Sequence, residues 1–167
     1  MQARQLMIGE PAGCIVLAVE DDVPIRRLLV SALTRAGLTV ASARDGTEAI
    51  EAMQKETYAV LLLDLMMPRM SGWDVIEWLK AHPTSRPRTV IILSAGKADV
   101  IDSLEPAIVN AVVLKPFDLH ELTAYVRSCC TADIVEDRRV KRLVGAQRSS
   151  PVAADTPQQG SIDADRS

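Results

Sequence analysis

The sequence predicts an α/β fold in which a parallel sheet is covered by helices on both faces. Short apolar runs of strand length alternate five times with amphipathic helical segments, and the apolar runs lack polar–apolar alternation. Runs without alternation are typical of strands buried on both faces. Repeated strand–helix units with right-handed crossovers then restrict the topology to a few doubly wound sheets.

The strands are predicted from five apolar runs bounded by polar or turn-forming residues. They span Cys14–Val19, Leu38–Ala41, Ala59–Leu63, Thr89–Leu93 and Ala111–Leu114. None approaches the roughly 20 apolar residues that a membrane helix needs. We therefore expect no contact with a membrane.

The helices are predicted from apolar side chains at helical spacing and from residues that favour helix ends. The first helix follows Asp22 as its N-cap and stops at Gly37. Later helices begin near Asp45, Ser71 and Asp118, where short polar side chains or glycine precede the apolar stripe.

One folded domain is expected at residues 14–130. Residues 1–13 read as a short leader, and residues 131–167 as a charged and then disordered tail, because the last part of the chain has almost nothing apolar to bury. Within the domain, a weaker fourth helix is expected to hold Ala98 and Leu104, with Ile101 between them.

Composition excludes several classes of protein. The net charge is −3 and no basic stripe occurs in the first 130 residues, so direct binding to DNA is not expected. The three cysteines, Cys14, Cys129 and Cys130, are odd in number and have no framework spacing. We therefore expect no disulfide framework and a reducing cytoplasm as the compartment. Cys129 and Cys130 are expected to pack in their helix and not to act as redox sensors.

Polar residues gather where the predicted strands end. Glu20 and Asp21 follow the first strand, Asp64 follows the third, Ser94 the fourth and Lys115 the fifth. The carboxyl ends of parallel strands share one edge of a sheet, where ligands of such folds bind. These five side chains are therefore expected to meet in one crevice.

The chemistry of this set favours a cation and a phosphoryl group. Three carboxylates held together repel one another, and a hard divalent cation such as Mg²⁺ relieves the repulsion. With the cation bound, the positive charge of Lys115 would exceed what the three carboxylates need, unless an anion also binds in the crevice. Asp64 is the best candidate nucleophile, because carboxylates form aspartyl phosphates.

Four segments together resemble the signature of the response-regulator receiver domain of two-component signalling. They are Val19–Asp22, Leu62–Pro68, Leu93–Ala95 and Leu114–Phe117, in family order over residues 14–130. The resemblance implies a flavodoxin-like (βα)5 fold with strand order 2-1-3-4-5. It further implies a phosphoprotein that receives its phosphoryl group from a sensor histidine kinase or a histidine phosphotransfer protein.

The resemblance also assigns roles at the metal and phosphoryl site. Asp64 falls on the phosphoacceptor, and Glu20 and Asp21 fall on the acidic pair that binds Mg²⁺. Met66 falls on a position whose main-chain carbonyl is a further ligand. Glu20 stands where Asp is more usual, and its longer arm is expected to reach the metal through water.

Further roles fall on the last two strands. Ser94 and Lys115 match the hydroxyl and lysine that bind the phosphoryl group, and the Lys115–Pro116 bond is expected to be cis. Val112 departs from the pattern, because many relatives carry Tyr or Phe there as part of the activation switch. That departure leaves the coupling to the signalling face open.

Several functions remain to be weighed. The leading one is a phosphorylated regulator that acts by binding a downstream protein, as an effector or as a shuttle in a phosphorelay, and not as a conventional enzyme. An aspartyl-phosphate phosphatase would need a second Asp where Met66 stands. A nucleotide carrier would need a glycine-rich phosphate loop, which the sequence lacks. A receiver-like binding module that works without phosphorylation is the alternative, and Val112 keeps it open.

Overall fold

The computed structural model describes residues 14–96, 103–131 and 141–143. The strands are β1 (Ile15–Val19), β2 (Thr39–Ala43), β3 (Val60–Asp64), β4 (Thr89–Ser94), β5 (Ala111–Leu114) and β6 (Lys141–Leu143). The helices are α1 (Val23–Arg35), α2 (Gly46–Lys55), α3 (Gly72–Ala81) and α5 (Leu119–Thr131), with a 3₁₀ turn at Pro83–Ser85. No helix within these described ranges is long and apolar enough to cross a membrane.

All strands lie parallel in one sheet of order β2-β1-β3-β4-β5-β6. The predicted order 2-1-3-4-5 is confirmed. In the register, Val19 lies beside Leu63, Asp64 beside Leu93, and Ser94 beside Leu114. The carboxyl ends of β1, β3, β4 and β5 therefore form one edge of the sheet.

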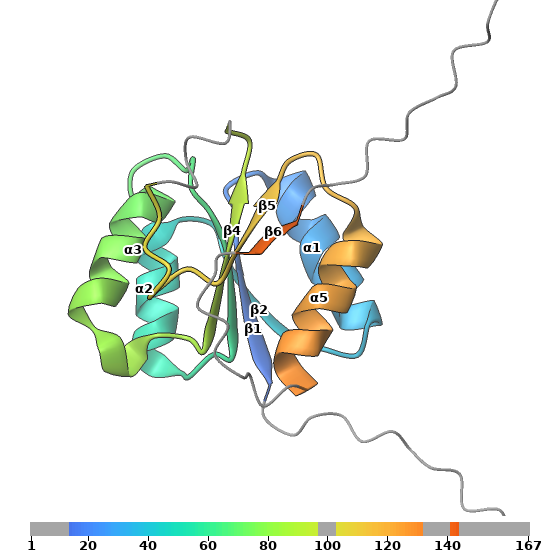
Figure 1. Ribbon diagram of the computed structural model, residues 1–167, viewed down its shortest axis with the longest axis horizontal. Coiled ribbons are helices and arrows are strands. Elements are labelled where there is room, and N and C mark those ends of the chain that lie inside the picture. Colours follow the sequence, from blue (N-terminus) through green and yellow to red (C-terminus); the bar gives the residue numbers. More distant parts are fainter. Residues whose placement is uncertain (1–13, 97–102, 132–140, 144–167) are drawn as a thin grey trace, which may run out of the picture.

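Helices cover both faces of the sheet, with α1 and α5 on one side and α2 and α3 on the other (Figure 1). Successive strand residues point to opposite faces. Leu17 and Leu61 accordingly belong to the core beneath α2 and α3, whereas Val16 and Leu62 belong to the core beneath α1 and α5. This double coverage explains the continuous apolar runs in the sequence.

The predicted helix boundaries are confirmed by their caps. The side chains of Asp22, Asp45, Ser71 and Asp118 each accept a hydrogen bond from the main-chain N–H three residues later. Such caps satisfy N–H groups that lack partners inside the helix. Past the end of α1, Gly37 has a φ of 83°, a left-handed conformation that glycine adopts most readily.

The predicted fourth helix is only partly within the described residues, because Ala98 and Ile101 lie outside them. The described residues 103–110 contain turns and no helix. Pro106 has no N–H for a helical hydrogen bond and so opposes a helix through this stretch. Leu104 is nevertheless buried in the core beneath α3, as its apolar character requires.

The short strand β6 adds a sixth member to the sheet beside β5. Its residues 141–143 fall within the region 131–167 that the sequence assigns to a charged and then disordered tail. Two cationic residues and one leucine give no strand signal on their own, and these residues pair with the outer side of β5. The domain limits stay a prediction.

A disulfide joins Cys14 to Cys130, so the expectation that Cys130 only packs in its helix is wrong. The two residues are 116 positions apart, but the fold brings their Cα atoms to 5.6 Å. Cys14 precedes β1 and Cys130 lies near the end of α5, so only the tertiary structure makes them neighbours. Cys129 is buried and outside the disulfide.

Candidate functional site

Three carboxylates meet at the carboxyl edge of the sheet, as the sequence predicts. Glu20 directly follows β1, Asp21 comes next, and Asp64 is the last residue of β3. One oxygen atom from each lies within 4.8 Å of the other two. Glu20 and Asp64 are buried, whereas Asp21 is half-buried and nearer the solvent.

Lys115 bridges two of these acids. Its Nζ donates to Asp64 Oδ2 at 2.6 Å and to Glu20 Oε2 at 2.8 Å. The exposed fractions of the side chains are 17% for Lys115, 1% for Glu20 and 5% for Asp64, so water screens these contacts poorly. The predicted lysine–carboxylate cluster is therefore present.

Burial and charge shift the pKa values of the cluster. Burial is the main cause that raises the pKa of Glu20, the nearby Asp64 charge adds to it, and the Lys115 hydrogen bond opposes it. For Lys115, burial lowers the pKa, but hydrogen bonds and charges from Asp64 and Glu20 outweigh burial and leave the pKa raised. The lysine therefore stays charged at neutral pH, and Glu20 holds a proton more readily than an exposed glutamate.

Ser94 lies at the same edge, buried at the end of β4. Its Oγ accepts a hydrogen bond from the N–H of Gly96 at 3.0 Å. Its carbonyl oxygen accepts one from the N–H of Lys115 at 2.7 Å, which ties the end of β4 to the residue after β5. Ser94 and Lys115 thus occupy adjacent places on the rim.

The remaining predicted residues differ in their surroundings. The N–H of Met66 donates to Asp64 Oδ1 at 2.9 Å, while the Met66 side chain is 71% exposed. The Lys115–Pro116 peptide bond is cis, as the resemblance implies. Val112 is fully buried in the core beneath α2 and α3.

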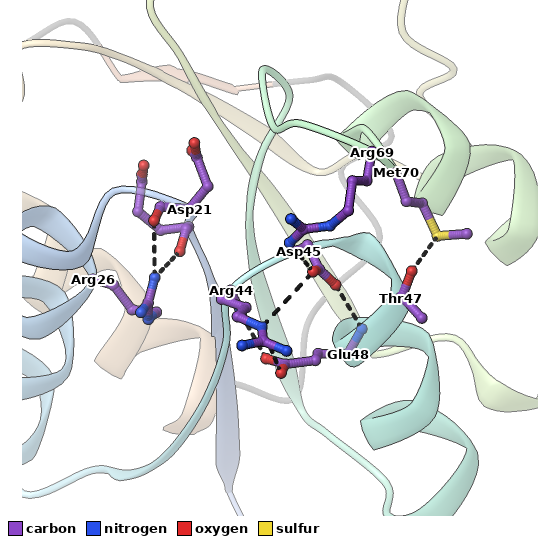
Figure 2. Close-up of polar contacts among 9 residues, drawn as sticks. Asp21, Arg26, Arg44, Asp45, Thr47, Glu48, Arg69 and Met70 are labelled. Atoms are coloured by element: carbon purple, nitrogen blue, oxygen red, sulfur yellow. Dashed lines mark hydrogen bonds and ion pairs between the residues drawn. The ribbon is translucent and has the colours of Figure 1, made fainter.

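Two arginines that the sequence reading did not single out hold the loops beside the acids (Figure 2). Arg26 Nη1 donates to the carbonyl oxygens of Glu20 and Asp21 at 2.6 and 3.1 Å. In the loop after β3, Arg69 Nη2 donates to the buried Asp45 carboxylate at 2.5 Å. The sequence contains one indication of the role of Arg26. A positive charge near a helix N-terminus is electrostatically unfavourable, so an arginine there suggests a nearby group that it binds.

The start of α3 also packs closely against the nucleophile candidate. A Cβ atom at Gly72 would overlap the carbonyl oxygen of Asp64 and lie 2.8 Å from Cα of Leu65. The N–H of Gly72 donates to the carbonyl oxygen of Leu65 at 3.1 Å. Glycine is therefore required where the chain turns from β3 into α3.

The donor set fits a magnesium ion. All three side chains offer carboxylate oxygens, which Mg²⁺ prefers, and Mg²⁺ commonly takes one or two carboxylates with water and a phosphate oxygen. Lys115 contacts two buried carboxylates, so one positive charge faces two negative ones and the remaining negative charge favours binding of a further cation. The arrangement can thus hold a hard divalent cation beside a carboxylate and an ammonium group.

A family model described as the response regulator receiver domain matches residues 16–127, which is most of the described chain. The chain belongs to the response-regulator receiver family. This is a family of signalling phosphoacceptor domains. The family assignment agrees with the fold and the strand order described above.

Similar proteins agree with this assignment. Probable transcriptional regulator ycf27 of Cyanophora paradoxa is 36% identical over 113 residues, which cover 68% of this chain and 46% of that protein. Response regulator PleD of Caulobacter vibrioides is 34% identical over 140 residues, covering 83% of this chain and 31% of PleD. The receiver chain therefore spans less than half the length of these relatives.

Solved receiver structures share the fold. Chemotaxis protein CheY4 of Vibrio cholerae has a TM-score of 0.63 and 26% identity, covering 70% of this chain and 98% of that one. Response regulator TrrA of Thermotoga maritima, solved in complex with Mg²⁺-BeF, has a TM-score of 0.61 and 27% identity, covering 70% and 98%. Almost the whole of each of these two chains is therefore covered by the match.

Proposed function

We propose that this receiver accepts a phosphoryl group on Asp64, with Mg²⁺ at Glu20, Asp21 and Asp64, from a histidine kinase or a histidine phosphotransfer protein. The observation that carries the proposal is the double contact of Lys115 with Asp64 and Glu20 inside a group of three carboxylates. A buried lysine between acids is typical of sites where charges must be balanced as a phosphoryl group arrives.

The proposed reaction is a transfer between a phosphohistidine and Asp64. A carboxylate oxygen of Asp64 attacks the phosphorus of a phosphohistidine, a P–O bond forms, and the P–N bond breaks. The imidazole leaves with the bonding electrons and takes up a proton. Glu20, Asp21 and Asp64 would hold Mg²⁺, which would supply positive charge to offset the negative charge of the transferring group. The main-chain carbonyl of Met66 is the proposed further ligand.

Lys115 and Ser94 are the proposed phosphoryl-binding residues. Lys115 already donates to Asp64, so its ammonium is in place to neutralise a phosphoryl oxygen bound there. Ser94 lies one strand away, and its hydroxyl is the proposed donor to another oxygen. The phosphorylated receiver would then signal in the cytoplasm through a downstream protein, and the described domain is not proposed to bind DNA.

A phosphate-affinity gel tests the proposal. We expect wild type treated with Mg²⁺ and acetyl phosphate to run as a retarded band, and Asp64→Asn to show none. Asp22→Asn is the matched control, because Asp22 caps α1 outside the three-carboxylate group and Asn also caps helices. Its band should shift like that of wild type.

The opposite result would favour the alternative. If wild type takes no label under conditions where Mg²⁺ binds, the domain is a receiver-like binding module that works without phosphorylation. If Asp64→Asn is labelled as fully as wild type, another residue is the acceptor.

A further inference from the structure

The loop after β1 carries two of the three carboxylates, and one arginine holds its main chain. Arg26 lies in the second half of the first turn of α1, and Figure 2 shows its guanidinium reaching back to this loop. Its Nη1 donates to the carbonyl oxygen of Glu20 at 2.6 Å and to that of Asp21 at 3.1 Å. One nitrogen atom therefore fixes two consecutive peptide groups.

These two peptide groups determine where the acidic side chains point. A net change in the backbone torsions of Glu20 or Asp21 would redirect the Cα–Cβ bonds of these residues and move their carboxylates apart, and the Arg26 hydrogen bonds to the two carbonyl oxygens oppose such a change. Mg²⁺ demands near-ideal octahedral geometry, and binding constellations work only when ligand atoms stay within about 0.5 Å of their places. The N–H of Glu20 also donates to the carbonyl oxygen of Ala43 at 3.2 Å.

Arg26 does this without occupying the ligand atoms. Among the described residues it forms no ion pair with a carboxylate, and its contacts are to carbonyl oxygens. The carboxylate of Glu20 is contacted by Lys115 instead. The carboxylate oxygens that a cation needs therefore stay clear of the guanidinium.

We infer that Arg26 is a positioning residue for the divalent cation, acting through the main chain of Glu20 and Asp21. This inference rests on the proposed function only in taking the three carboxylates as the Mg²⁺ site. Arginine suits the role because its planar, permanently charged fork holds fixed donor directions, whereas lysine offers a flexible point charge.

The neighbouring Arg27 provides a matched control. It lies on the same helix and lines the same surface groove as Arg26, together with Val23 and Ser42. Arg27 is exposed, and none of the side-chain hydrogen bonds or ion pairs recorded for the described residues involves it. Replacing either arginine removes one positive charge near the acids, but only the Arg26 replacement frees the loop.

The sign of the effect separates positioning from charge. Loss of a positive charge alone strengthens Mg²⁺ binding slightly, so Arg27→Met should bind Mg²⁺ as tightly as wild type or somewhat more tightly. Arg26→Met should instead weaken binding about tenfold, the usual order for losing a residue that orients ligands. Arg26→Lys should lie between wild type and Arg26→Met, since one ammonium can still reach a carbonyl.

The experiment titrates the full chain with MgCl₂ by calorimetry at constant ionic strength, without a phosphodonor. Thermal unfolding checks that each variant is folded. If Arg26→Met does not fold, Arg26→Lys, which keeps the positive charge and the aliphatic part of the side chain, replaces it in the comparison. At saturating Mg²⁺, Arg26→Met should reach the wild-type labelled fraction with acetyl phosphate, because Arg26 does not touch the reacting atoms.

The outcomes are distinct from those for phosphorylation. The inference would be overturned if Arg26→Met, Arg26→Lys and wild type bind Mg²⁺ with equal affinity. It would also be overturned if replacing Arg26 and replacing Arg27 change the affinity equally, or if wild type does not bind Mg²⁺. A wild-type protein that binds Mg²⁺ but takes no label would contradict the proposed function and leave the affinity comparison to decide on Arg26.

Discussion

The two ends of the sheet are held together in different ways. At the carboxyl edge, Lys115 links Glu20 and Asp64 by hydrogen bonds and charge, contacts that can exchange without breaking a covalent bond. At the opposite end, Cys14 before β1 is joined covalently to Cys130 near the end of α5. The carboxyl edge therefore carries the charged groups of the candidate site and the opposite end carries the covalent link, so reducing the disulfide should leave the carboxylate cluster intact.

The largest expected effect is on stability and comes from the disulfide end. Reducing the Cys14–Cys130 bond opens a loop with a sequence separation of 116, and closing such a loop stabilises a fold by about 4 to 5 kcal/mol in the chain-entropy account. We expect the free energy of unfolding, measured in urea, to fall by about that amount in reductant. Mg²⁺ affinity should not change while the protein stays folded.

Cys14→Ala is the control for the disulfide, since its unfolding should be insensitive to reductant. A wild-type unfolding midpoint that is equal with and without reductant would contradict a stabilising role for the bond. A reductant-induced loss of Mg²⁺ binding by folded protein would break the proposed separation of the two ends.

The next effect comes from the carboxylate end. Lys115→Met leaves the buried carboxylates of Glu20 and Asp64 without their cation, and loss of one partner of a buried pair typically costs about 3 kcal/mol. Urea unfolding should show this loss at pH 7. Excess Mg²⁺ should restore more stability to the variant than to wild type, because it replaces the missing charge.

If Mg²⁺ stabilises wild type and Lys115→Met equally, the lysine and the ion do not share the same carboxylates. Lys80→Met is a suitable control, because Lys80 pairs with Glu77 and Glu105 on the surface away from this cluster. It should lose little stability and show no special response to Mg²⁺.

A smaller effect is expected for Asp45, whose pKa is lowered chiefly by the hydrogen bond from the N–H of Glu48 and then by Arg69. The folded state then binds fewer protons than the unfolded state near the ordinary pKa of 3.8, so stability rises with pH there. Asp45→Asn keeps a cap but loses the ion pair. It should cost about 1 kcal/mol at pH 6, given that Arg69 is largely exposed.

That difference should shrink below about pH 4, as wild-type Asp45 is protonated through its lowered pKa. Urea unfolding of both proteins from pH 6 to pH 3 measures it. A difference that stays constant with pH would show that the charge of Asp45 is not what stabilises the loop. Arg69→Gln should reproduce the loss at pH 6.

The smallest effect is kinetic. Met66 is 71% exposed two residues after Asp64. We predict that its side chain limits the approach of water to the carboxylate of Asp64 once that group is phosphorylated. Met66→Asn should speed loss of the phosphoryl group about two- to threefold, which is under 1 kcal/mol in barrier height. Stability should not change. The decay of the retarded gel band measures the rate, and an equal rate in both proteins would remove this role.

The sequence was sufficient for the carboxyl edge because strand ends can be read from local apolar runs. Once Glu20, Asp64 and Lys115 are seen to follow three parallel strands, topology alone brings them together. The pairing of Cys14 with Cys130 could not be predicted in that way, because it depends on how α5 packs against β1 and not on any local spacing.

The contact of Arg26 with the main chain of the loop after β1 could not be predicted from the sequence either. A carbonyl oxygen has no sequence signature, since every residue carries one, so a side chain that binds the main chain leaves only an indirect trace. Residues 103–110 show the same limit. The sequence predicts that Leu104 faces the core, and it is buried there, but it lies in a turn and not in the predicted helix.

Strand β6 has a consequence for how other chains can approach. The outermost strand of an open sheet presents unpaired amide and carbonyl groups that invite a foreign strand, and this includes unwanted self-assembly. Residues 141–143 use those groups on one side of β5. A protein that recognised this molecule by extending its sheet next to β5 would have to displace the molecule's own residues first, whereas β2 at the other margin has no such guard among the described residues.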